Sequence, residues 1–136
     1  MEPLKVGLIG LGRCGVLAAE SLLANSWSRL IAVGSQKPHR LADFAARYPQ
    51  VATHDDFRSL IVNHPLDALC VAVPPFARPH YLQLAAERRL PVWMLTPAAR
   101  RLDEAVEILD KFDSAGVPLV LSSDLTMNPA SANSLR

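Results

Sequence analysis

The stretch GLIGLGRCG, residues 7–15, decides the fold that we predict for this chain. It places Gly10, Gly12 and Gly15 in a GxGxxG pattern between an apolar run and a helical pattern. In such a turn the first glycine allows the bend, the second lets the backbone approach a pyrophosphate, and the third lets the helix pack closely on the strand. Free N–H groups at the helix start would then bind the anion. A glycine-rich turn can also be no more than a tight turn, so the surrounding pattern has to decide.

The rest of the chain alternates between strand-like and helical patterns. The strand-like runs are continuous and apolar, which is typical of strands covered on both faces, and they occupy residues 4–9, 30–34, 67–73, 91–95 and 118–122, with 51–54 as a further short strand. Helical patterns lie between them, at residues 16–23, 41–48, 57–62, 81–88 and 102–112. Pro38 and Pro79 suit first helical turns, and Asn25 and Gly116 suit helix ends.

This alternation predicts a single α/β domain, a doubly wound and mostly parallel sheet of the Rossmann type with strand order 3-2-1-4-5-6. We expect residues 1–122 to form this dinucleotide-binding domain. Residues 123–136 are polar and rich in helix-breaking residues. They are predicted to be a tail or the start of a linker to a C-terminal domain that the chain lacks.

The composition excludes several classes of function. The chain has 136 residues and a formal net charge of +1, so it offers no broad basic field for nucleic acid. Its apolar runs are too short to span a membrane, and we expect a cytoplasmic protein. Cys14 and Cys70 are its only cysteines, so neither a disulfide framework nor a metal site is predicted, and Cys70 is expected in the core.

A cluster of His54, Asp55 and Asp56 resembles a set of metal ligands at first sight. Neighbours in sequence point to different sides, however, and no second pair stands at ligand spacing. We therefore expect Asp55 or Asp56 to cap the helix that begins at Phe57, and no metal site.

The end of the second predicted strand gives the second clue to the ligand. There an NAD-binding domain usually carries a carboxylate for the adenosine ribose, but this chain has Gly34 and Ser35, and the next acid is Asp43. Ser35 with Lys37 and Arg40 could hold a 2′-phosphate. The pattern favours NADP over NAD and weighs against an S-adenosylmethionine site, although Lys37 and Arg40 could equally form a solvated helix face. A GxxxxGK[ST] loop is missing, so ATP hydrolysis is not supported.

With these features and the run DALCVAVPP at residues 67–75, residues 4–130 resemble the N-terminal domain of the glucose-fructose oxidoreductase and inositol dehydrogenase (Gfo/Idh/MocA) family. The resemblance implies a domain of an NAD(P)-dependent oxidoreductase. In that family a His begins the helix after the fourth strand, and the fifth strand ends in Glu-Lys-Pro. Here Arg78 stands at the His position, and Leu95, Thr96 and Pro97 stand at the Glu-Lys-Pro positions.

These departures concern the chemistry of the site. The resemblance implies that the family Lys contacts the nicotinamide ribose and the substrate and helps the proton transfer. Thr96 has a hydroxyl that does not titrate usefully, and His80 could replace the family His only with a local shift. We therefore expect no catalytic residue in this chain, with Thr96 at the position of the family Lys.

The leading hypothesis is an NADP(H)-binding domain without the catalytic Lys and without the substrate domain. The alternative is a catalytically inactive nucleotide-binding module with a regulatory or assembly role, and whether the chain is an enzyme stays open. The predicted cofactor-binding residues are Gly10, Gly12, Arg13, Cys14, Gly15, Ser35, Gln36, Lys37, Arg40, Val73, Pro74, Pro75, Thr96 and Pro97.

Family members carry a substrate domain after the Rossmann part, and its open sheet supports oligomers. Without that domain we expect Trp93 and Met94 to be exposed at the sheet edge, which would favour a homo-oligomer.

Overall fold

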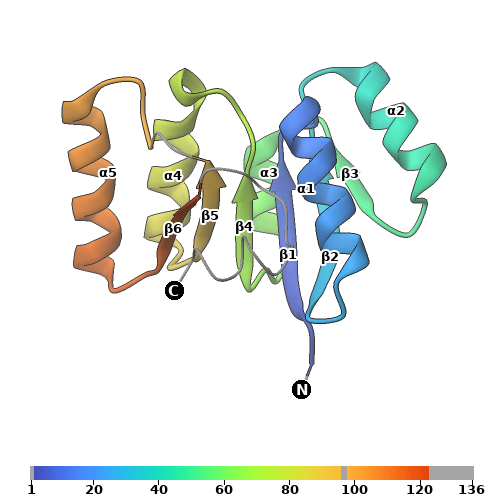
Figure 1. The fold of residues 1–136 in the computed structure, drawn as a ribbon, viewed down its shortest axis with the longest axis horizontal. Helices are drawn as coiled ribbons and strands as arrows, with labels where there is room; N and C mark the ends of the chain where they lie inside the picture. Colours follow the sequence, from blue (N-terminus) through green and yellow to red (C-terminus); the bar gives the residue numbers. More distant parts are fainter. Residues whose placement is uncertain (1, 96–97, 123–136) are drawn as a thin grey trace.

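The computed structural model describes residues 2–95 and 98–122, which form one parallel sheet with helices on both faces. The strand order is β3-β2-β1-β4-β5-β6, as the alternation predicted (Figure 1). The strands are β1 (Leu4–Ile9), β2 (Ser28–Gly34), β3 (Ala52–His54), β4 (Ala68–Val71), β5 (Val92–Leu95) and β6 (Leu119–Ser122). The helices are α1 (Arg13–Ala24), α2 (Pro38–Arg47), α3 (Phe57–Asn63), α4 (Arg78–Glu87) and α5 (Leu102–Ala115), with a short 3₁₀ turn at Pro75–Ala77.

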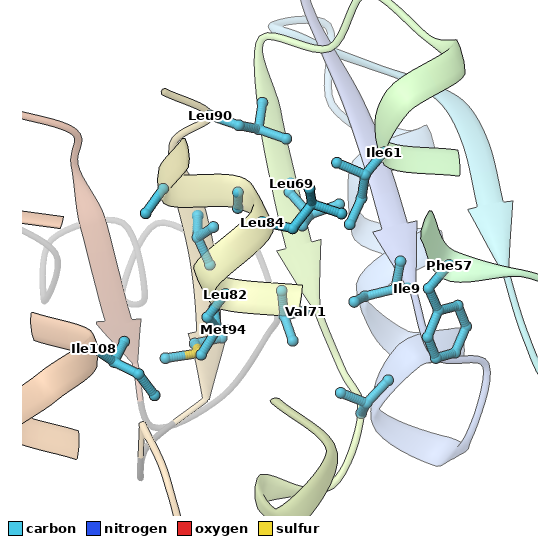
Figure 2. Packing of buried hydrophobic residues seen from close by; sticks show 14 of the residues in the cluster. Ile9, Phe57, Ile61, Leu69, Val71, Leu82, Leu84, Leu90, Met94 and Ile108 are labelled. Atoms are coloured by element: carbon cyan, nitrogen blue, oxygen red, sulfur yellow. The ribbon is translucent and has the colours of Figure 1, made fainter. Parts of the chain in front are cut away.

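Two hydrophobic cores lie on opposite faces of the sheet. Successive strand residues point to opposite faces, so Leu69 and Val71 belong to one core and Cys70 to the other. The larger core packs the sheet against α3, α4 and α5 (Figure 2), and the smaller packs it against α1 and α2. Cys70 is fully buried, as expected, and burial raises the pKa of its thiol. The strands have continuous apolar sequences because helices cover both faces of the sheet.

The helix ends follow the local signals of the sequence. Pro38 and Pro79 both lie in first helical turns. Asn25 ends α1, and Gly116 ends α5 in the left-handed conformation with φ of 68°. The Asp56 carboxylate caps α3, because it accepts a hydrogen bond from the backbone N–H of Arg58 at 3.1 Å. The prediction of a capping aspartate is thus confirmed for Asp56.

The expectation that Trp93 and Met94 are exposed at a sheet edge needs correction. Met94 is fully buried and Trp93 half-buried, because β5 lies inside the sheet with β6 beyond it. Helix α5 buries Ile108 and Phe112, whereas Leu102, at the start of the predicted helical pattern, is 82% exposed. The helix lies beside α4 at the end of the sheet and has a neighbour on one side only (Figure 1).

Among the described residues, no helix has the length and apolar character needed to cross a bilayer.

Candidate functional site

A cleft lies at the carboxyl ends of β1 and β4. The arrowheads of these strands point to the upper edge of the sheet in Figure 1. From β1 the chain proceeds toward β2, whereas from β4 it proceeds toward β5, so the strand order reverses at this point. Ligands of doubly wound sheets bind at such a reversal. The cleft has a volume of about 620 Å³. Its lining residues are Gly10, Leu11, Gly12, Arg13, Cys14, Ser35, Gln36, Lys37, Arg40, Phe57, Ala72, Val73, Pro74, Pro75, Phe76, Ala77, Arg78 and Leu95.

The glycine loop forms the floor of the cleft. Gly10 has a φ of 101°, and a Cβ there would lie 2.8 Å from the carbonyl oxygen of Ala72. A Cβ on Gly15 would overlap the carbonyl oxygen of Gly10, so the close packing of α1 on β1 depends on this glycine. Gly12 is the N-cap of α1 and has no side chain to satisfy the first N–H groups of that helix. The loop is therefore a cradle of backbone donors suited to a pyrophosphate.

The wall at the end of β2 is made of polar and basic side chains. Ser35 is buried and directly follows the strand, and its Oγ accepts a hydrogen bond from the backbone N–H of Lys37 at 3.2 Å. The Arg40 guanidinium reaches back from α2, with Nη1 3.6 Å from the place that a Cβ on Gly12 would take. Arg40 therefore faces the glycine loop, whereas Gln36 and Lys37 are exposed residues of the cleft wall.

The opposite wall comes from the ends of β4 and β5. Arg78 begins α4 and is only 4% exposed. Its Nε donates to the carbonyl oxygen of Val73 at 2.9 Å, and its Nη1 donates to that of Leu95 at 2.7 Å. Pro74 and Pro75 continue this wall. Arg78 thus holds the ends of two strands together.

Most of the predicted cofactor residues lie in one place. All of them line the cleft except Gly15, which lies under the loop, and Thr96 and Pro97, which fall outside the described residues. The structure adds Phe57 and Phe76, which the sequence reasoning missed. Phe57 directly follows the capping Asp56, and Phe76 directly follows the proline pair. Each lies in the connection or first turn that follows the carboxyl end of a strand, β3 for Phe57 and β4 for Phe76, which points to this edge of the sheet.

The charged side chains that line the cleft in the described part of the chain are all cationic. Four cationic residues line it, namely Arg13, Lys37, Arg40 and Arg78, and in the described part of the chain no Asp or Glu is among its lining residues. A dinucleotide carries its negative charge on the pyrophosphate and, in NADP, also on the 2′-phosphate. Cations on both walls and free N–H groups on the floor therefore fit such a ligand.

Behind the wall at β2, two histidines contact each other. The Nε2 atoms of His54, at the end of β3, and His64, after α3, are 2.7 Å apart. Burial lowers the pKa of His54, and the nearby His64 lowers it further. Within residues 2–95 and 98–122, no three His, Cys, Asp or Glu side chains gather as a metal site would require.

Comparison with known families gives a match over nearly all of the domain. The model of the oxidoreductase family with an NAD-binding Rossmann fold (Gfo/Idh/MocA) matches residues 4–123. The 1-carboxy-3-chloro-3,4-dihydroxycyclohexa-1,5-diene dehydrogenase of Comamonas testosteroni is 24% identical over 118 residues, which cover 87% of this chain and 30% of that protein. The chain thus spans about a third of the length of this curated relative.

Solved structures show the same fold. An oxidoreductase from Agrobacterium radiobacter in complex with NAD+, L-tartaric acid and magnesium has a TM-score of 0.82 at 21% identity, covering 89% of this chain and 35% of its own. The scyllo-inositol dehydrogenase of Lactobacillus casei, with bound NAD(H) and scyllo-inositol, has a TM-score of 0.80 at 20% identity, covering 88% and 36%. At such identities the likeness shows the fold alone.

Proposed function

The chain belongs to the Gfo/Idh/MocA family of oxidoreductases, and we propose that its cleft binds NADP(H) in preference to NAD(H). One observation carries this proposal. The wall at the end of β2 presents Ser35, Lys37 and Arg40, and no Asp or Glu is among the lining residues that the structure describes. A carboxylate there would bind the ribose hydroxyls of NAD and repel a 2′-phosphate, whereas these groups attract one.

Arg40 and Lys37 would contact a 2′-phosphate from different positions. The Arg40 guanidinium lies beside Gly12, between the β2 wall and the glycine loop, so it can reach the 2′-phosphate and the pyrophosphate. Lys37 is exposed, and its backbone N–H is held by the Ser35 hydroxyl. That hydrogen bond closes the turn between β2 and α2. Arg40 is therefore the stronger contact, because it is half-buried and already turned inward.

Calorimetric titration with NADPH and NADH tests the proposal. We expect NADPH to bind at least about tenfold more tightly, the effect of one charge-assisted contact with phosphate. Arg40→Gln should weaken NADPH binding by about tenfold and so reduce the difference in affinity between NADPH and NADH. Arg47→Gln is the matched control, because Arg47 lies on the same helix but pairs with Glu20 away from the cleft. NADH binding as tightly as NADPH, or an unchanged NADPH affinity in Arg40→Gln, would contradict the proposal.

A second candidate is a nucleotide-binding module without hydride-transfer activity, which regulates or assembles with other proteins. It is favoured by Arg78 at the family His position, because an arginine stays protonated and here donates to backbone carbonyls. Thr96 at the family Lys position supports it as well. Restoring the lysine with Thr96→Lys in the full reading frame should create dehydrogenase activity where the unaltered protein has none. Substantial activity in the unaltered protein would refute this candidate.

A further inference from the structure

Helix α5 carries a second apolar surface besides the one that it buries in the core. Leu102, Val106 and Leu109 are 82%, 48% and 44% exposed, and their spacing of four and three residues aligns them along one side of the helix. The described part of the chain exposes seven large apolar side chains, and three of them lie in this one row. Single apolar residues on a surface need no explanation, whereas a contiguous group marks an interaction site. We call these three residues the α5 stripe.

The α5 stripe faces away from the rest of the domain. Helix α4 lies on the other side of α5, and in the described part of the chain the groove between the two helices is lined by Glu104, Glu107 and Lys111 but by no residue of the stripe. Figure 1 shows α5 at the end of the molecule, with no described helix or strand beyond it. The stripe is also separate from the cofactor cleft, because none of its residues is among the lining residues described there.

The charges around α5 differ between its two ends. Arg100 and Arg101 are exposed just before the first turn, and Asp110 and Asp113 are exposed near the end. The last turn contains no basic residue, so the two aspartates lie at the negative end of the helix dipole, where a cation would be favourable. Among the described residues neither aspartate has an ion-pair partner, whereas Arg101 pairs with Asp103 at 3.0 Å. The apolar stripe therefore lies between a basic flank and an acidic end.

A second copy of the same helix, running antiparallel, complements both properties at once. When Leu102 of one copy lies opposite Leu109 of the other, the two Val106 side chains meet near the two-fold axis. At a rise of about 1.5 Å per residue, Asp113 then extends about 6 Å beyond Leu102 of the other copy, beside the basic residues that precede its α5. The contact occurs twice, because a two-fold interface repeats each of its contacts. The chain itself thus provides a partner with a matching apolar row and the opposite order of charges.

We propose that two copies of this chain associate through α5, with their stripes packed antiparallel about a two-fold axis. The surface differs from the sheet edge that was expected from Trp93 and Met94. One helix from each copy makes an interface at the small end of specific complexes, about 1,200 Å² or less in total. We therefore expect a weak dimer, with a dissociation constant of about 10–100 μM. The proposal does not depend on cofactor binding, because the stripe and the cleft are separate among the described residues.

Sedimentation equilibrium of the full chain over about 5–500 μM tests the proposal, because this range brackets the expected dissociation constant. The unaltered protein should show a monomer–dimer equilibrium. Val106→Lys should weaken association by at least about a hundredfold, since it sets two ammonium groups side by side at the axis. Leu17→Lys is the matched control, because Leu17 lies on α1 with a similar exposure of 45% and its change should leave the dissociation constant unaltered. Circular dichroism checks that both variants are folded.

Charge reversal tests the antiparallel orientation. Reversing both aspartates (Asp110→Lys with Asp113→Lys) or both arginines (Arg100→Glu with Arg101→Glu) brings like charges together and should weaken the dimer by at least about tenfold. A chain with all four changes has opposite charges at each contact again and should recover the dimer. In a parallel pair each end would meet its own copy, so no reversal would alter the affinity. Both reversals place charges that the helix dipole favours, so α5 should stay folded.

Three results would overturn the proposal. The first is a chain that stays monomeric at about 500 μM, as would be found where a protein of different sequence covers the stripe. The second is a dimer that persists in Val106→Lys, which would place the interface on another surface. The third is a dimer that is insensitive to the single reversals or is not recovered by the combined one, which would exclude antiparallel packing. NADPH binding by a monomeric chain would leave the proposed function in place.

Discussion

The two ends of the cleft are built in different ways. The floor uses backbone and glycines, and the β2 wall adds Ser35, Lys37 and Arg40; all of them fall within residues 7–15 and 32–40 of the sequence. The β4 and β5 wall depends on one long side chain, Arg78, which contacts carbonyls from two separate strands. The first end is thus assembled from two short stretches of sequence, whereas the second joins residues 73, 78 and 95. A cradle made of backbone can therefore be recognised from a local sequence pattern, whereas the other wall depends on where one side chain finds its partners.

Gly15→Ala should break the glycine-loop end and have the largest effect on the fold. The added methyl group would overlap the Gly10 carbonyl, so α1 would have to move away from β1 at a cost of about 3 kcal/mol in the free energy of unfolding. Urea denaturation measures this loss. Gly12→Ala is the control, because among the described residues its methyl group would meet just the Arg40 guanidinium, at 3.6 Å, and it should cost about 1 kcal/mol or less. Equal losses in the two variants would contradict the tight packing at Gly15.

Arg78→Met tests how far the other end depends on one side chain. The change removes the donors to the carbonyls of Val73 and Leu95 and should lower the free energy of unfolding by about 2 kcal/mol. Thermal and urea unfolding would show it. Arg88→Met, at an exposed position just after the same helix, should change stability by no more than about 0.5 kcal/mol. An Arg78→Met protein as stable as the parent would mean that these strand ends are held by other contacts.

Asp56→Ala should have a smaller effect, on the helix that carries Phe57 into the cleft. The carboxylate caps α3 through the N–H of Arg58 at 3.1 Å and accepts from the Ser59 hydroxyl at 3.0 Å. Its loss should cost about 1 kcal/mol, measurable as a lower midpoint of urea unfolding. Asp55→Ala is the neighbouring control and should be close to neutral. A larger loss for Asp55 than for Asp56 would reverse the assignment of the cap.

The smallest expected effect is a pH dependence of stability that comes from His54, at the end of β3. Folding lowers the pKa of His54 from 6.5, first through burial and then through His64, so the unfolded chain binds the proton more readily. Stability should therefore fall as the pH drops below about 6.5, until it passes the lowered pKa of the folded state. His64→Gln should weaken this dependence, whereas His80→Gln, at an exposed position, should not. Melting temperatures from pH 5 to 8 would measure it, and identical profiles for all three proteins would refute the coupling.

Much of the fold could be predicted from local sequence. The continuous apolar runs and the glycine pattern were enough for the strand order, because right-handed crossovers leave few ways to arrange alternating strands and helices. The errors came from packing at the end of the sheet. Met94 was expected at an edge, but β6 covers β5 on that side. Helix α5 has apolar residues on more than one face, so its periodicity alone could not show which face is buried.

The sequence by itself determined the glycine cradle and the absence of an acid directly after β2. The cradle depends on backbone geometry at Gly10, Gly12 and Gly15, which a short sequence motif is enough to specify. The lack of a carboxylate after β2 can be read from residues 32–40. Only the tertiary structure decided that Arg40 turns toward Gly12 and that Arg78 connects Val73 with Leu95. The reason is physical: a long side chain has many rotamers, and its direction depends on partners that the chain brings together from distant positions.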